Sequence, residues 1–109
     1  MKPWEVWDWE FPHGKHPAVI VSPEARCLNT DIQTVNILGC SSRRASRAAE
    51  IHEVLLDEAD GLDWETLCRC DVLFLAKKSE LTRRRGMVTY ERRRNLGQKV
   101  IRLFALWLG

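Results

Sequence analysis

Two charged residues interrupt an apolar stretch of the chain and could do acid–base chemistry together. Arg69 and Asp71 lie within residues 66–76, which are otherwise rich in strand-forming apolar side chains. In an extended chain, side chains two positions apart point to the same face, so the spacing predicts one shared face for this pair. The alternative is structural: a same-face ion pair could hold two strands in register, because charges persist in a core only when they are paired.

Arginine clusters are the second chemical feature. They comprise Arg43, Arg44 and Arg47; Arg83, Arg84 and Arg85; and Arg92, Arg93 and Arg94. A guanidinium group binds phosphates through two hydrogen bonds and stacks on bases. Any one cluster could equally be a solvated face or a partner for carboxylates, and the formal net charge is only +2. Several clusters in one short chain nevertheless favour a surface that binds RNA or another acidic partner.

Length and composition are those of one domain, which we expect to cover residues 1–109. Hydrophobic residues make up 45% of the chain and charged residues 29%, an ordinary globular balance. No apolar run approaches the roughly 20 residues that a membrane-spanning helix needs. The first residues lack the basic and then apolar pattern of a secretion signal. We therefore expect a cytoplasmic protein with no membrane partner.

The cysteines argue against a metal centre. Cys68 and Cys70 have a C-x-C spacing, whereas zinc sites more often use C-x₂-C pairs. Cys27 and Cys40 lie far away in the sequence. We expect reduced cysteines in or near the core, with neither metal nor cofactor.

Short strands followed by one helix must position these residues. The expected strands cover residues 4–11, 18–22, 32–40, 50–56, 66–76 (as one strand or two shorter ones) and 85–89. Residues 12–15 and 57–63 are expected turns, 24–31 a loop, 41–49 an exposed, mobile loop, and 77–81 a helical turn.

The C-terminal segment has the pattern of an amphipathic helix. Thr89 has N-cap chemistry for a helix that begins at Tyr90. One apolar face at helical spacing is expected from Leu96, Val100, Leu103 and Trp107. The whole pattern predicts a mainly β (α+β) fold, in which a small, strongly bent sheet or barrel is closed by this helix.

In order and spacing, several segments resemble the MazF/PemK (Kid) toxins of type II toxin–antitoxin systems, over nearly the whole chain. The segments are the aromatic opening strand, His16-Pro17-Ala18-Val19-Ile20-Val21-Ser22-Pro23, Val35-Asn36-Ile37-Leu38-Gly39-Cys40-Ser41-Ser42, Arg69-Cys70-Asp71, Lys77-Lys78-Ser79-Glu80-Leu81 and the final helix. The resemblance implies an SH3-like barrel, usually homodimeric. It also implies a metal-independent endoribonuclease that cuts single-stranded RNA at short sequences and is neutralised by a cognate antitoxin.

The resemblance also implies site residues. The family's Gly-x-Arg-Pro-Ala motif matches residues 14–18, with His16 where a catalytic Arg is usual, and its Thr-Ser matches Ser41-Ser42. Arg-Cys-Asp of PemK-type members is unchanged. Catalytic roles are implied for Arg69, Asp71, His16 and Ser41, and RNA contacts for Lys15, Ser42, Arg43, Arg44 and His13.

RNA cleavage through the 2′-hydroxyl needs a base, an acid and a cation for the crowded phosphorane. Asp71 could be the base or could orient a partner, Arg69 could be the acid or a phosphate clamp, and Ser41 could donate a hydrogen bond to phosphate. His16 titrates near neutrality. Because the family normally has an arginine, a permanent cation, at this position, we expect His16 to have an acid or cationic role. The cleavage rate should then change with pH near 6.5. The alternative is a turn histidine before proline.

Two other function classes stay open. A non-catalytic SH3-like module could bind RNA or a peptide, and the loss of the usual Arg at position 16 favours that alternative. A gyrase-poisoning toxin of related fold would bind protein and would not cut RNA. Growth arrest that is lost when Arg69 is changed would separate the enzyme from the module.

Overall fold

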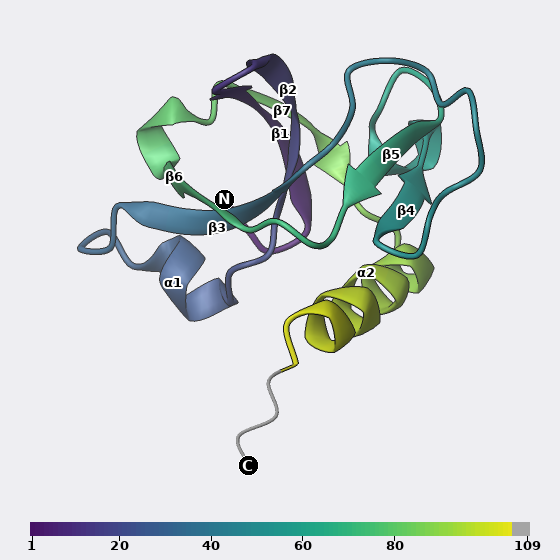
Figure 1. Cartoon of the computed structure of the whole chain (residues 1–109). Helices are drawn as coiled ribbons and strands as arrows, with labels where there is room; N and C mark the ends of the chain where they lie inside the picture. Colours follow the sequence, from purple (N-terminus) through teal and green to yellow (C-terminus); the bar gives the residue numbers. More distant parts are fainter. Residues whose placement is uncertain (106–109) are drawn as a thin grey trace.

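Two antiparallel sheets and a C-terminal helix form the computed structural model, which describes residues 1–105 (Figure 1). The strands are β1 (Glu5–Phe11), β2 (Gly14–Ile20), β3 (Thr34–Gly39), β4 (Glu53–Leu56), β5 (Thr66–Arg69), β6 (Phe74–Lys77) and β7 (Arg83–Met87). The helices are α1 (Glu24–Leu28) and α2 (Tyr90–Leu103), with short 3₁₀ turns η1 (Glu58–Asp60) and η2 (Lys78–Glu80). The mainly β fold with a C-terminal helix is as the sequence predicts. Within the described residues, no helix is both long and apolar enough to cross a membrane.

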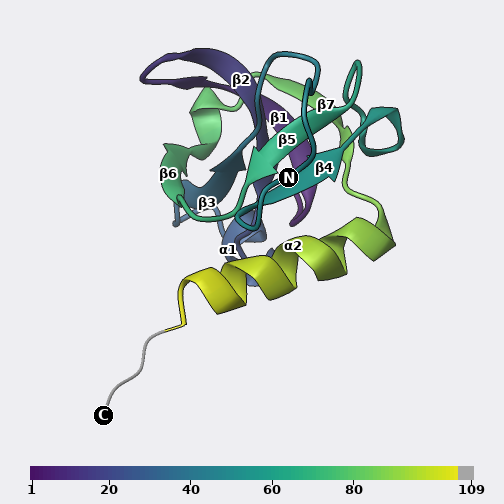
Figure 2. The same ribbon diagram turned by 45° about the vertical axis from the view of Figure 1, so that its right-hand side comes forward.

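The larger sheet has the strand order β6-β3-β2-β1-β7, and β4 and β5 form a separate hairpin. The two sheets meet at a single bridge between Cys40, just after β3, and Cys68 in β5. Figure 2 shows α2 running along the outside of the molecule below β4. The ends of β2, β3 and β5 are therefore brought to one place.

The central strands bury side chains on both faces. Val19 and Leu38 belong to one hydrophobic cluster, which also receives Leu96 of α2. Their sequence neighbours Ile20 and Ile37 belong to a second cluster on the other face. Alternate residues of a strand point to opposite faces, so the apolar run in the second strand is buried on both faces.

The structure corrects several predicted boundaries. Residues 24–31 begin with helix α1, not a loop: Pro23 precedes it, Glu24 suits the positive end of its dipole, and Cys27 is buried. The second strand begins at Gly14, four residues earlier than predicted, because the turn needs only residues 12 and 13. The predicted strand 50–56 is formed only over residues 53–56. Residues 66–76 form two strands, β5 and β6, which is one of the two predicted alternatives.

The beginning of α2 is tied to the turn before β5. The Thr89 side chain accepts a hydrogen bond from the Arg92 N–H, which confirms the predicted N-cap. Buried Asp60 accepts from the backbone N–H of Asp57 and of Thr89, at 2.9 Å each, and from Arg92 Nη1 at 2.6 Å. This one carboxylate therefore joins η1 to the N-terminus of α2.

The predicted apolar face of α2 is only partly buried. Leu96 is fully buried and Val100 packs against the core. Leu103, which was predicted to share that face, is 38% exposed because the helix extends beyond the sheets (Figure 2). Trp107 lies outside the described residues.

We expect Asp60→Ala to lower the free energy of unfolding by about 3 kcal/mol or more, because it leaves two backbone N–H groups and part of a guanidinium without their acceptor. Urea denaturation followed by circular dichroism measures this. The matched control is Asp31→Ala at an exposed position, which we expect to change stability by about 0.5 kcal/mol or less. Equal stability of the two variants would contradict the assigned role of Asp60.

Candidate active site

A cavity of about 460 Å³ opens where β1, β2, the 41–47 loop and the end of β5 meet. Its wall includes most of the side chains that the sequence singled out: His13, His16, Ser41, Arg43, Arg44 and Arg69. Phe11 and Phe74 supply much of the apolar surface, with their rings edge to face at 5.0 Å between centroids. Three separate segments thus contribute polar groups to one aromatic-lined hollow.

Arg69 and Asp71 form a paired unit at the edge of this cavity. Arg69 Nε and Nη2 donate to the two Asp71 oxygens at 3.0 and 2.7 Å. Of the two predicted alternatives, the structure has two shorter strands: β5 ends at Arg69, and Asp71 lies in the bend that follows. The side chains are 54% and 32% exposed, so this is not a core ion pair.

The pair fixes the charge of both groups. The hydrogen bond from Arg69 lowers the pKa of Asp71, and the same bond raises the pKa of Arg69. Arg69 lines the cavity, whereas Asp71 does not. An ionised, low-pKa carboxylate behind a guanidinium is a weak proton acceptor. Asp71 is thus better suited to orient Arg69 than to act as a base.

His16 lies on β2 beside His13, and their ring centroids are 4.6 Å apart. Burial, and then the nearby charge of His13, lower the pKa of His16 below its usual value of 6.5. Its Nδ1 is buried without a hydrogen-bond partner in the described part of the chain, whereas Nε2 is not enclosed. At neutral pH the ring is therefore mostly neutral, with Nε2 available to a ligand.

The loop that carries Ser41 is held against β5. The Ser41 N–H donates to the Leu67 carbonyl at 3.0 Å, and Thr66 Oγ1 donates to the Ser41 carbonyl at 2.6 Å. The Ser41 hydroxyl oxygen accepts from the Arg43 N–H at 3.1 Å, so its own proton is free to point into the cavity. This loop is exposed, as predicted, but it is anchored by backbone hydrogen bonds.

A buried carboxylate anchors the far end of the same loop. Glu53, whose side chain is only 5% exposed, accepts from Arg47 Nη1 and Nη2 at 2.6 and 2.9 Å and from the Glu50 N–H at 3.0 Å. The Arg47 hydrogen bonds lower the pKa of Glu53 to about 2. Both residues line the cavity, and the sequence alone had assigned neither a role in the site.

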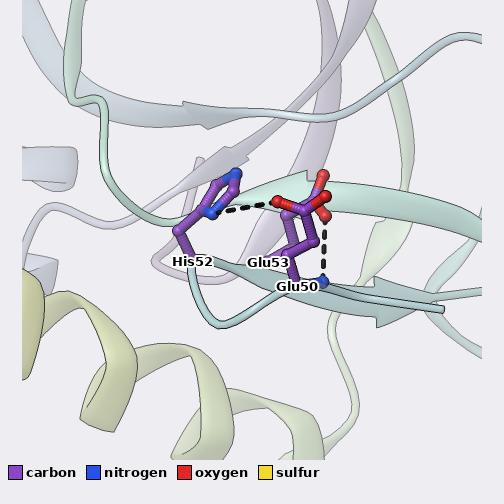
Figure 3. A group of neighbouring side chains, drawn as sticks. All are labelled: Glu50, His52 and Glu53. Atoms are coloured by element: carbon purple, nitrogen blue, oxygen red, sulfur yellow. Dashed lines mark hydrogen bonds and ion pairs between the residues drawn. The ribbon is translucent and has the colours of Figure 1, made fainter.

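Glu50, His52 and Glu53 also form a small group that could in principle hold a metal ion (Figure 3). Their ligand atoms lie within 4.8 Å of one another, and His52 Nδ1 is 3.8 Å from Glu50 Oε2. Both Glu53 oxygens already accept hydrogen bonds from Arg47. The group is therefore satisfied by a guanidinium, and the expectation of a metal-free site stays a prediction.

The remaining predicted residues line a second cavity of about 200 Å³, on the other side of His16 and Ser41. Lys15 and Ser42 belong to its wall. So does Trp64, which sequence reasoning missed because it follows an acidic turn and belongs to no periodic pattern. Arg44 Cζ lies 5.7 Å from the centroid of the Trp64 ring.

In the other two arginine clusters, three of the six arginines bind carboxylates of this chain. Arg84 pairs with Glu5, Arg85 with Asp8 and Asp63, and Arg92 with Asp57 and Asp60. For these clusters the structure supports the alternative of carboxylate partners over a phosphate surface. The cluster at residues 43–47 lines the first cavity, and Arg85 of the second cluster lines the second cavity.

Solved structures with this fold include several toxins. A mycobacterial endoribonuclease in complex with its cognate antitoxin aligns with a TM-score of 0.83 at 20% identity, over 100% of this chain and 99% of that one. The Mycobacterium tuberculosis toxin MazF-mt6 aligns with a TM-score of 0.76 at 18% identity, over 94% and 98%. A MazE–MazF structure from Deinococcus radiodurans aligns with a TM-score of 0.74 at 17% identity, over 98% and 97%.

No family model matches the sequence, and no curated protein matches it. At these identities the structural likeness establishes the fold, which is that of the MazF toxins along nearly the full length of both chains. It confirms the fold that the sequence resemblance implied.

We expect Glu53 to make stability depend on acid pH. Its folded pKa of about 2 lies below the ordinary value of 4.5, so its contribution is complete above about pH 4.5 and is lost as the pH falls towards 2. The stability difference between wild type and Glu53→Gln should therefore be largest near neutrality and should shrink in acid. Urea denaturation at a series of pH values measures it, with the exposed Glu58→Gln as control. A gap that stays constant down to about pH 2 would contradict this assignment.

Proposed function

We propose that this protein is a metal-independent endoribonuclease that cuts single-stranded RNA through the 2′-hydroxyl. The observation that carries the proposal is the convergence of His16, Ser41 and Arg69, from three segments, on one cavity. The fold adds support, because one structural neighbour is described as an endoribonuclease with its antitoxin and others as MazF toxins.

In the proposed reaction the 2′-oxygen attacks the adjacent phosphorus and the 5′-oxygen leaves. Neutral His16 takes the 2′-hydroxyl proton at Nε2, for which its lowered pKa suits it. His13, whose ring lies beside His16, acts as the general acid and gives a proton to the leaving 5′-oxygen. Arg69 and the Ser41 hydroxyl stabilise the negative charge that grows on the phosphorane oxygens. This assigns His16 the base role, in place of the acid or cationic role expected from the sequence.

Asp71 has a positioning role in this proposal. Its two hydrogen bonds to Arg69 hold the guanidinium in one orientation at the cavity wall. Preorganised charge stabilises a transition state without rearranging during the reaction. Arg43, Arg44 and Lys15 then supply the positive charge that attracts the RNA backbone.

The proposal extends to partners and location. We propose a cognate antitoxin as the neutralising partner, a homodimer as the active form and the cytoplasm as the location. Support for the antitoxin comes from the structural neighbours, several of which are described as complexes with an antitoxin or with MazE. A single-domain organisation over residues 1–109 belongs to the same proposal.

One observation favours a second candidate, a non-catalytic RNA-binding module of the same fold. The position implied to hold a permanent arginine cation carries His16, whose lowered pKa leaves it mostly neutral at pH 7. Such a module would keep the arginines of the 41–47 loop and bind RNA without cutting it.

The decisive experiment incubates the purified protein with a long RNA in EDTA and maps the new ends. We expect wild type to cut and to leave 2′,3′-cyclic phosphates. Arg69→Ala should be slower by about 100-fold or more, because it removes a transition-state cation. The matched control is the exposed Arg83→Ala on β7, which should cut normally.

Circular dichroism checks that each variant is folded. Normal cleavage by folded Arg69→Ala would overturn its assignment. Activity that EDTA abolishes and a divalent metal restores would overturn the metal-free mechanism. Intact RNA that nevertheless stays bound to wild type would favour the non-catalytic module.

We expect the cleavage rate to rise with pH through a limb below pH 6.5, because a general base works only when it is deprotonated and the His16 pKa is lowered. At higher pH the rate should fall again, as the general acid loses its proton. His16→Ala should cut slowly and lose the rising limb, and His16→Arg should flatten it. His52→Ala, outside both cavities, should keep it. A rising limb that survives in His16→Ala would contradict this role.

A further inference from the structure

We propose that the second cavity binds one nucleobase of the RNA, next to the phosphate that is cut. In this proposal Trp64 is the surface on which the base stacks, and Asp63 contacts the edge of the base. The inference rests on the proposed ribonuclease function and names the part of the site that would select the sequence.

The second cavity adjoins the site of the proposed chemistry. His16 and Ser41 line both cavities, so the second cavity begins where the proposed chemistry takes place. A phosphate held beside these two residues would leave the base of an adjoining nucleotide within reach of the second cavity. The volume of about 200 Å³ is below the roughly 300–1,000 Å³ of pockets for drug-sized ligands, and suits one planar ring.

Trp64 gives the second cavity an aromatic surface. Trp64 lines the second cavity and Arg44 lines the first, and the Arg44 guanidinium lies 5.7 Å from the centroid of the Trp64 ring. The pair therefore lies at the boundary between the cavities. Arg44 lies over the Trp64 ring. Proteins that bind single-stranded nucleic acids stack the bases on aromatic rings and on guanidinium planes of this kind.

Charged side chains form a polar wall of the second cavity. Arg85 Nη1 and Nη2 bind Asp8 Oδ1 and Asp63 Oδ2, each at 3.0 Å. The Arg85 and Asp8 side chains are nearly buried, whereas the Asp63 side chain is 63% exposed. Arg85 therefore fixes the Asp63 carboxylate at the mouth of the cavity, where its Oδ1 can accept a hydrogen bond.

The Asp63 carboxylate in this wall would make the cavity prefer some bases over others. A carboxylate accepts hydrogen bonds from exocyclic amino groups, as in contacts of Asp or Glu to cytosine N4. Adenine, cytosine and guanine carry such groups and uracil carries none. We therefore expect the cavity to favour one of those three bases over uracil at one position of the cut site.

The binding test uses fluorescent 2′-O-methyl oligonucleotides, which lack the 2′-hydroxyl nucleophile, with one position fixed as each base in turn. We expect Trp64→Ala to weaken binding about 10-fold or more, the usual scale for losing one base stack, and Trp64→Phe to keep most of it. The matched control is Tyr90→Ala, which removes an exposed aromatic outside both cavities and should bind like wild type.

The selectivity test compares cut-site sequences from a random RNA pool. We expect wild type to disfavour uracil at one position and Asp63→Asn to change that preference while still cutting, since an amide donates as well as accepts. Unchanged preferences in Asp63→Asn would overturn the role of Asp63.

The two proposals can fail separately. Folded Trp64→Ala that binds the oligonucleotides like wild type overturns the base site, whether or not wild type cuts RNA. Wild type that binds but does not cut overturns the ribonuclease, and the Trp64 variants still decide the base site. No binding by wild type overturns the base site directly. If Trp64→Ala does not fold, Trp64→Phe and Trp64→Leu, of similar bulk with and without a ring, replace it in the comparison.

Discussion

The contact between Cys40 and Cys68 joins the two sheets, and the candidate site depends on it. The Cys40 N–H donates to the Pro17 carbonyl at 2.9 Å, and the next N–H, of Ser41, donates to Leu67 at 3.0 Å. One short stretch is thus bonded to β2 on one side and to β5 on the other. Both cysteines are buried, so two small side chains allow the strands to approach closely. His16, Ser41 and Arg69 meet because their strands meet here.

Carboxylates determine which arginines are available for a ligand. Net charge gave little sign of a polyanion partner, since it is only +2. Glu5 and Asp8 occupy two of the arginines on β7, and Asp57 and Asp60 occupy one on α2. The 41–47 loop differs. Only Arg47 of its arginines pairs with Glu53, so Arg43 and Arg44 stay at the cavity wall. Local pairing, which the count of charges does not reveal, produces the positive surface.

The strands and the start of α2 could be predicted, because their residues follow strong local patterns. Alternating or continuous apolar runs gave the strands, and Thr89 gave the start of α2, because these signals are local. Helix α1 was missed because five residues are too few to show a helical period. The β2 start was missed because Pro12 and Gly14 predict a turn, and only pairing of His16 with Trp9 shows that the strand begins earlier. Tertiary pairing therefore decided where β2 begins.

The candidate site was predicted less completely, for a related reason. Arg69 and Asp71 were predicted from their spacing in an apolar stretch and from the family resemblance, and His16 and Ser41 from the resemblance, which records residue types in order along the chain. Trp64, Asp63 and the Arg47–Glu53 pair belong to no such motif, and their partners are brought to them by the fold. The lowered pKa of His16 is likewise a property of burial and of a neighbouring ring, not of the residue type. A histidine in place of an arginine therefore need not be a weakened copy of it, because this environment favours the neutral ring, which can accept a proton.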